Sequence, residues 1–352
     1  MFNSFAEKNR AFGLDVSANS IKLALLEKSG KTFKLQGFSQ ATLPKGVIIN
    51  DAVVDLKTFN YVLGQLLEKP QFGKINTKYV VASLPEAKSF VRVIQIPLMT
   101  DAEAESAVPF EAENFIPMPI DQVYLDWQKI GNNGDKTDVL IVASPKEAVD
   151  KYLSILDQAN LKPVALEVES QSCCRAVIAK DSKETALITD IQANRTSLIM
   201  VENGFLQFTS SIPLAGNAFT ESIARALGVS STKAEEIKKK VGIPNTAEYP
   251  NIRNALLPVL ASFSAEIKNI LKFHSEHSEK PVDRILLSGG SAKLKNIAEF
   301  LQSELQDQNN LKVELTDPWI NLGIASAAPL EKIQNLEFTT ALGLALRGVE
   351  MD

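Results

Sequence analysis

The sequence predicts an α/β fold of two related lobes with a ligand-binding cleft between them, and three segments carry this prediction. Two of them place an Asp at the end of an apolar, β-rich run and continue through small polar residues into a second apolar run: residues 12–26 around Asp15 and residues 186–201 around Asp190. The third, residues 284–292, is a strand that leads into a double-glycine turn. A hairpin that is used twice indicates two related halves. Two acidic turns that face each other can hold a Mg²⁺-bound triphosphate, because carboxylates bind the metal and turn amides bind phosphate oxygens.

The first half begins as a sheet and then contains an inserted block. Alternating and turn residues predict a β-meander over 12–39, a helix over 54–67 and a strand over 78–83. Residues 86–164 have the pattern of a compact β-α-β-β-α subdomain, and Thr100 three residues ahead of Glu103 predicts a capping box at its first helix. Its expected elements are strands at 89–96, 123–130 and 138–144 and helices at 102–114 and 145–158.

The second half repeats the sheet and adds helices. A helical stretch over 214–279 separates its hairpins from the double-glycine turn, and an amphipathic helix is expected over 293–305. The expected subdomains are the first-lobe core at 1–85 (1A), the inserted block at 86–164 (1C), the return to the first lobe at 165–183, the second-lobe core at 184–213 and 283–335 (2A), the helical subdomain at 214–282 (2B), and a closing helix at 336–352 that packs on the first lobe.

Composition excludes several classes of protein. The 352 residues are enough for two or more domains, and the 45% apolar content is that of an ordinary soluble protein. A net charge of −5 argues against a broad nucleic-acid surface. No apolar run of about 18 residues, N-terminal export signal or amphipathic C-terminal anchor is recognisable, and the neighbouring Cys173 and Cys174 cannot readily bridge to each other. We therefore expect a cytoplasmic protein.

The order of these loops resembles the actin-like ATPase superfamily, whose duplicated fold is ribonuclease H-like. An insertion at 86–164 resembles the cell-division protein FtsA and its relatives. Within the superfamily, several further strings look most like the PilM family of type IV pilus assembly: residues 111–119, 210–216 followed by Thr220, 234–242 and 338–345.

The resemblance implies a nucleotide site for ATP or ADP with Mg²⁺. Asp15 and Asp190 would approach the metal directly or through water, and Lys22 would reach the β-phosphate. Glu169 stands where the superfamily positions the attacking water. The remaining implied contacts are the phosphate-turn residues Ser17, Ala18, Asn19, Ser20, Gln192, Ala193, Asn194 and Thr196, the ribose-binding pair Glu235 and Lys238, and the adenine-binding Gly289, Gly290 and Ser291.

One departure from the superfamily pattern affects catalysis. Both phosphate turns usually read Asp-x-Gly, whereas this chain has Ser17 and Gln192 at the glycine positions. A side chain there stands where backbone and phosphate approach closely, so we expect nucleotide binding with slow or no hydrolysis.

The PilM resemblance also implies a scaffold that captures the cytoplasmic N-terminal tail of a PilN-like inner-membrane protein and contacts other pilus-assembly proteins. The tail would lie in a groove between the inserted block and the first half, with residues 89–96 and 110–116 as candidate linings. The protein would reach the inner face of the membrane through this partner, and homo-oligomer formation is left open. Two alternatives remain: an FtsA-type division protein, which needs a membrane anchor, and an ATP-hydrolysing enzyme of the actin and sugar-kinase superfamily.

Overall fold

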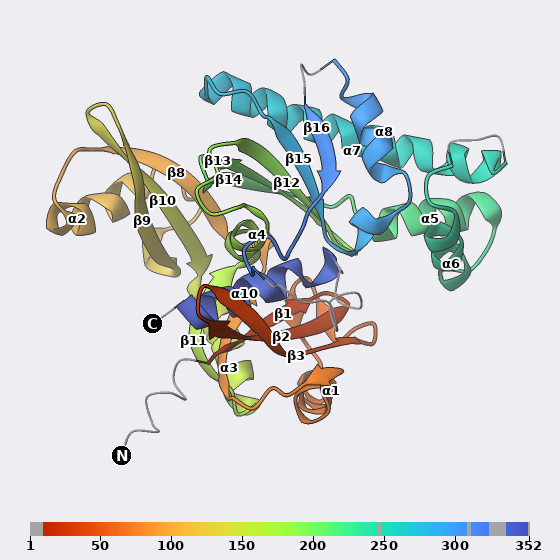
Figure 1. The fold of residues 1–352 in the computed structure, drawn as a ribbon, viewed down its shortest axis with the longest axis horizontal. Helices are drawn as coiled ribbons and strands as arrows, with labels where there is room; N and C mark the ends of the chain where they lie inside the picture. The colour runs from red at the N-terminus through yellow and green to blue at the C-terminus, as the bar shows by residue number, and fades with distance from the viewer. Residues whose placement is uncertain (1–9, 245–247, 308–310, 324–335, 351–352) are drawn as a thin grey trace.

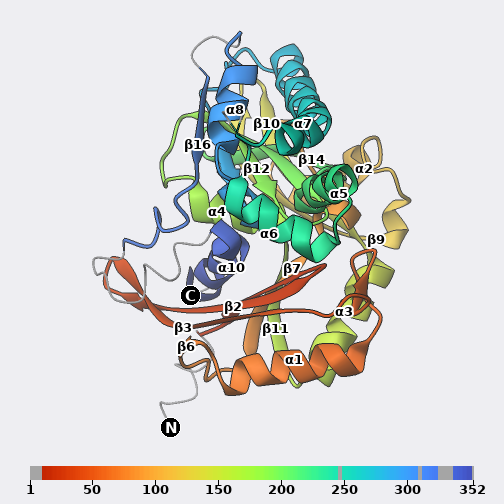
Figure 2. The ribbon, with the colours of Figure 1, turned by 90° about the vertical axis from the view of Figure 1, so that its right-hand side faces the viewer.

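The computed structural model describes residues 10–244, 248–307, 311–323 and 336–350, and it has two lobes with a sheet in each (Figures 1 and 2). This confirms the predicted two-lobed, actin-like α/β architecture. The first lobe is built on a six-stranded sheet in the order β11-β7-β1-β2-β3-β6. Its strands are β1 (Phe12–Ser17), β2 (Ser20–Ser29), β3 (Thr32–Thr42), β6 (Phe72–Gly73), β7 (Tyr79–Leu84) and β11 (Lys162–Val168).

Helices cover both faces of the first-lobe sheet, so its central strands are buried on both sides. Along β2, Ile21 and Leu23 join the core beneath α1 (Leu56–Glu68) and α3 (Lys146–Gln158). The alternate residues Ala24 and Leu26 face α10 (Thr339–Glu350), which also packs against α4 (Glu169–Val177). The expected closing helix therefore crosses from the second lobe to the first.

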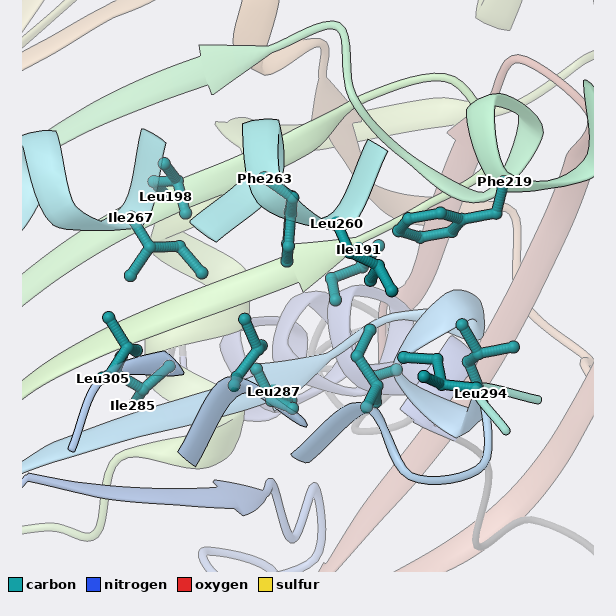
Figure 3. Close-up of a cluster of buried hydrophobic side chains, with 14 of the residues drawn as sticks. Ile191, Leu198, Phe219, Leu260, Phe263, Ile267, Ile285, Leu287, Leu294 and Leu305 are labelled. Atoms are coloured by element: carbon teal, nitrogen blue, oxygen red, sulfur yellow. The ribbon is translucent and has the colours of Figure 1, made fainter. Parts of the chain in front are cut away.

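The second lobe shares an eight-stranded sheet with the inserted block, in the order β16-β15-β12-β13-β14-β8-β10-β9. Figure 3 shows its core, where Phe263 and Ile267 of α7 lie over Ile285 and Leu287 of the sheet. The remaining elements are strands β8 (Phe90–Pro97), β9 (Val123–Asn133), β10 (Lys136–Pro145), β12 (Thr185–Ile191), β13 (Thr196–Glu202), β14 (Phe205–Ile212), β15 (Arg284–Ser288) and β16 (Lys312–Leu315), helices α2 (Asp101–Ala112), α5 (Gly216–Leu227), α6 (Ser231–Val241), α7 (Pro250–His277) and α8 (Ile297–Glu304), the ribbon β4 (Ile48–Ile49) and β5 (Ala52–Val53), and the 3₁₀ turns η1 (Glu86–Lys88), η2 (Ile120–Gln122), η3 (Gly290–Lys293) and η4 (Leu336–Phe338).

The inserted block has the strands and first helix that the sequence predicts, and the Thr100–Glu103 capping box is present. Its chain enters and leaves through the first lobe, yet its strands extend the second-lobe sheet. The junction is thin: β8 pairs with β10 over eight residues but with β14 through the single pair Arg92 and Phe208. The block therefore bridges the two lobes.

Two expected elements differ in the structure. Helix α3, placed in the inserted block by the boundary at 164, packs Ile155 and Leu156 into the first-lobe core. The single helix expected over 293–305 is instead η3 followed by α8, because Asn296 has a φ of 66°, which a right-handed helix excludes. The expected ranges 1–85, 214–282, 283–335 and 336–352 each include some residues outside the described part of the chain.

In the described ranges, no helix is both long and apolar enough to cross a bilayer.

Candidate nucleotide cleft and an adjoining pocket

A cleft of about 500 Å³ lies between the lobes, within the size range of small-molecule sites. All three predicted loops contribute to its wall. The expected site residues that line it are Asp15, Ser17, Asn19, Ser20, Lys22, Asp190, Gln192, Ala193, Glu235, Lys238, Gly289, Gly290 and Ser291.

The first phosphate turn is held by a buried ion pair. Asp15 near the end of β1 lies directly opposite Lys22 on β2, and Lys22 Nζ is 3.0 Å from Asp15 Oδ2. Burial by itself would lower the pKa of Lys22, but the carboxylates of Asp15, Asp190 and Glu337 together raise it. The other oxygen, Asp15 Oδ1, is buried without a hydrogen-bond partner.

The second phosphate turn places Asp190 against the first. Asp190 is 3% exposed, and burial together with the nearby Asp15 carboxylate raises its pKa. Gln192 Nε2 donates to Asp190 Oδ2 at 2.8 Å, so the side chain that replaces the superfamily glycine occupies a carboxylate oxygen of the site.

The double-glycine turn requires glycine for steric reasons. Gly289 has a φ of 84°, and a Cβ there would lie 2.5 Å from the Ile191 carbonyl oxygen and 2.7 Å from Asp190 Oδ1. Ser291 Oγ donates to the Gln192 carbonyl at 3.0 Å, which ties the turn to the second phosphate turn. Glycine at position 289 therefore allows this turn to pack closely against the second phosphate turn.

The expected ribose-binding pair lies on α6. Lys238 Nζ contacts Glu235 Oε2 at 2.7 Å and also donates to the Gly216 carbonyl at 2.9 Å and to Thr220 Oγ1 at 2.8 Å. Burial lowers the pKa of Lys238, while the Glu235 contact opposes this shift. Glu235 is also paired with Lys239 and accepts a hydrogen bond from the Thr220 hydroxyl, so both members of the expected pair bind protein groups in this structure.

The residues present fit a Mg²⁺–nucleotide. Mg²⁺ is commonly held by one or two carboxylates together with phosphate oxygens and water. Asp15 and Asp190 provide two buried carboxylates, one with an unpartnered oxygen, and Lys22 offsets only part of their charge. In the described ranges, no group of three or more His, Cys, Asp or Glu side chains could hold a metal without further ligands, so the phosphates would have to supply the rest.

Four expected site residues are not in the cleft wall. Thr196 is buried and donates its hydroxyl to the Leu214 carbonyl at 2.6 Å. Ala18, Asn194 and Glu169 instead line an adjoining pocket of about 110 Å³. Segment 210–216 resembles the family, but the sequence analysis assigned none of its residues to the site. The cleft residues that were not expected are Gly216, Asn217, Phe219, Lys239, Lys293, Leu294, Leu336, Glu337 and Thr340.

The adjoining pocket lies where the first lobe, the start of the inserted block and the second phosphate turn meet. It is lined by residues of β7, η1, β10, α3 and the β4–β5 ribbon, and it shares Ser17, Gln192 and Ala193 with the cleft. A weak ion pair between Asp51 of the ribbon and Arg195 of the second phosphate turn, at 3.7 Å, spans the lobes beside it. The two phosphate turns therefore separate two cavities.

The turns, the cleft and the inserted block together define a protein of the actin-like ATPase fold. Spiroplasma citri MreB5 bound to ADP shares this fold, with a TM-score of 0.52 and 13% identity over 90% of this chain and 94% of that one. A family model described as type IV pilus assembly protein PilM matches residues 13–349. The chain belongs to the PilM family, as the sequence resemblance indicated.

Two further similarities agree with this assignment. A solved PilM-PilN type IV pilus biogenesis complex contains a chain that is 30% identical, with a TM-score of 0.80 over 96% of this chain and 98% of that one. The cell division protein FtsA of Neisseria meningitidis serogroup B (strain MC58) is 23% identical over 284 residues, which cover 70% of this chain and 66% of the relative. The chain spans about two thirds of the length of such curated relatives.

Proposed function

We propose that this chain is a cytoplasmic scaffold of type IV pilus assembly that binds ATP or ADP with Mg²⁺ as a structural or regulatory ligand. The observation that carries the nucleotide assignment is the presence of the buried carboxylates Asp15 and Asp190 and the double-glycine turn in the wall of one cleft. The Gln192–Asp190 hydrogen bond supports slow or absent hydrolysis, since fast phosphoryl transfer depends on tight positioning of the γ-phosphate and water.

We further propose that the adjoining pocket receives the cytoplasmic N-terminal tail of a PilN-like inner-membrane protein. The solved PilM-PilN complex supports a partner of this kind. The pocket lies between the first lobe and the inserted block, as expected of the groove, but it is built from η1, α3 and β10 and includes Ser89, with no residue from 110–116. We also propose that the chain contacts other pilus-assembly proteins and that it associates with the inner membrane through the PilN-like partner.

The nucleotide half is tested by calorimetry with Mg²⁺–ATP and Mg²⁺–ADP. Asp190→Asn keeps the side-chain shape and should remove metal-dependent binding, whereas Asp157→Asn, on the exposed face of α3, should bind as the parent protein does. Bound nucleotide should raise the melting temperature by mass action. Turnover at or above about 1 s⁻¹ without partners would contradict the scaffold role, since enzymes typically work at roughly 1–10³ s⁻¹.

The tail half is tested with a fluorescent peptide that covers the cytoplasmic N-terminal segment of the PilN-like partner. Ala148→Arg places a long side chain in the pocket from α3 and should abolish peptide binding while Mg²⁺–ATP still binds. Glu147→Arg introduces the same residue on the exposed face of that helix and should leave peptide binding intact. Equal peptide affinity in both variants would place the tail elsewhere.

A further inference from the structure

The adjoining pocket contains an acidic side chain that the fold leaves incompletely satisfied. Glu86 begins η1, directly after β7 and Pro85, and is 5% exposed. Its Oε2 accepts a hydrogen bond from the Ser170 backbone N–H at 3.1 Å, but Oε1 is buried without a partner. Burial raises the pKa of Glu86, although the nearby hydroxyls of Thr209 and Ser170 oppose the shift.

A second carboxylate stands beside the first. Glu169 is the first residue of α4 and lines the same pocket as Glu86. Burial and the negative charges of Asp15, Glu86 and Asp190 raise its pKa well above the ordinary value, and a hydrogen bond from the Glu86 backbone N–H offsets this only in part. Each carboxylate therefore accepts a hydrogen bond from a backbone N–H of the other segment, Glu86 from α4 and Glu169 from η1. The two acidic groups lie in the wall of the same pocket.

The described part of the chain pairs no basic side chain with these two carboxylates. Among the described residues no ion pair reaches Glu86 or Glu169, and the buried Lys22 is held by Asp15. Lys88, Lys151 and Arg195 also line the pocket without forming an ion pair with either glutamate. The hydrogen bonds to backbone N–H groups account for one oxygen of each carboxylate. They do not account for Glu86 Oε1, which is buried without a partner, and such an atom costs free energy.

We propose that Glu86 and Glu169 form a cation subsite, in which a positively charged N–H group of the bound tail occupies the pocket. This rests on the proposed tail binding and names the chemistry that the tail must bring. A neutral amide would donate to Glu86 Oε1 only, whereas an ammonium or guanidinium group would donate to it and also offset the negative charge of the ionised carboxylates. The group is either a Lys or Arg side chain or the free N-terminal amine of the tail, since all share this chemistry.

The subsite can be tested without the tail by NMR. The Ser170 amide donates to Glu86 and is therefore a direct reporter. Nα-acetyl-arginine amide should shift the Ser170 amide resonance in a saturable way, while the uncharged isostere Nα-acetyl-citrulline amide should not. Glu86→Gln should abolish the shift, and Glu105→Gln, exposed on α2, should preserve it. Equal responses to the two probes, or an unchanged response in Glu86→Gln, would overturn the proposal even if no tail binds.

Peptides then identify the source of the charge. Acetylation of the tail N-terminus tests the terminal amine, and replacement of each Lys or Arg by a neutral isostere tests the side chains. The modification that removes the bound cation should lower affinity by about ten- to hundredfold in the parent protein, as loss of a hydrogen bond to a charged group does, and should have little further effect in Glu86→Gln. If wild-type protein fails to bind any tail peptide but responds to the arginine probe, the proposed tail function fails and the cation subsite stands.

Thermal stability separates this subsite from a purely structural lock. If Glu86 and Glu169 lack a cationic partner until a ligand binds, Glu86→Gln and Glu169→Gln should keep or raise the melting temperature of the free protein and should weaken cation binding. A structural lock predicts the opposite: a lowered melting temperature with cation binding unchanged. That second pattern would refute the proposal.

Discussion

The pairing of Asp15 with Lys22 shows what residue-level inference reached and where it stopped. The sequence placed both residues in the cleft and assigned them to a metal and a phosphate. In the structure they bind each other, because the tight β1–β2 turn sets them directly opposite. A hairpin register can be inferred from turn length, but the buried state of Lys22 depends on the second lobe, which no local pattern encodes.

We predict that Lys22→Met destabilises the protein by about 3–5 kcal/mol, because it leaves the Asp15 carboxylate buried without its partner. The double variant Asp15→Asn, Lys22→Met should recover much of this loss, since both charges are then gone. Lys28→Met on the exposed end of the same strand is the matched control. Urea unfolding of the parent, the single variants Asp15→Asn and Lys22→Met, the double variant and Lys28→Met gives the comparison, and additive losses in the double variant would refute a coupled pair.

The pH dependence of stability follows from buried carboxylates whose negative charge is only partly offset by neighbouring groups. Burial raises the pKa values of Glu86, Glu169 and Asp190 in the folded state. Such groups bind more protons folded than unfolded, so their contribution to the free energy of unfolding falls as pH rises from the unfolded pKa of about 4.3 through the folded pKa. The stability gained by Glu86→Gln with Glu169→Gln should therefore be larger at pH 7 than at pH 5. An equal gain at both values would show that the two groups do not titrate differently on folding.

At the scale of single elements, sequence periodicity located most helices and strands, and the capping box of α2 was foreseen in full. Periodicity did not predict that the backbone angle of Asn296 interrupts the helix expected over 293–305. It also did not predict that α3 packs into the core of the first lobe, because that packing depends on the tertiary structure. The closing helix was expected to reach the first lobe. How closely it packs there could not be read from the sequence, because contact between helix backbones depends on the glycines that meet.

We predict that Gly343→Ala in α10 costs roughly 1–3 kcal/mol, since its Cβ would lie 1.8 Å from the Ser172 carbonyl oxygen of α4 and force the helices apart. Gly64→Ala in α1 is the control, because its Cβ would meet no described atom within 4 Å beyond its chain neighbours and the backbone of its own helix. An exposed helical glycine replaced by alanine should gain about 0.5–1 kcal/mol. Thermal unfolding should thus shift in opposite directions for two identical substitutions, and a shift in the same direction would contradict the close helix contact.

At the scale of the whole molecule, the sequence predicted two lobes and an insertion but not how the insertion is attached. Strand patterns identify each strand and which face is buried, yet they do not name the neighbour. The pairing of β8 with β14 joins segments from different halves of the chain through the single pair Arg92 and Phe208. This junction is therefore the most weakly paired part of the eight-stranded sheet between β14 and β10.

We predict that the junction exchanges its amide hydrogens faster than the sheets on either side. By mass spectrometry, a peptide covering 208–212 should take up deuterium sooner than one covering 197–201, since β13 is paired along both edges while β14 is paired fully along one. A peptide covering 138–143, paired with both β8 and β9, serves as the protected control in the block. Equal exchange rates in all three peptides would show that the junction is as stable against local opening as the strands on either side, and would contradict the prediction.

The packing of α10 on the first-lobe sheet has a consequence for the order in which the molecule is made. During synthesis β1, β2 and β7 precede the second-lobe elements, whereas α10, which packs on their sheet, follows those elements. Until α10 is made, Ala24 and Leu26 lack part of their cover, and the contact that supplies it joins segments far apart in sequence, which makes it slow to form. The sheet of the first lobe is therefore made before the second lobe but completed after it, and its apolar face stays accessible to chaperones and to misassembly in the interval.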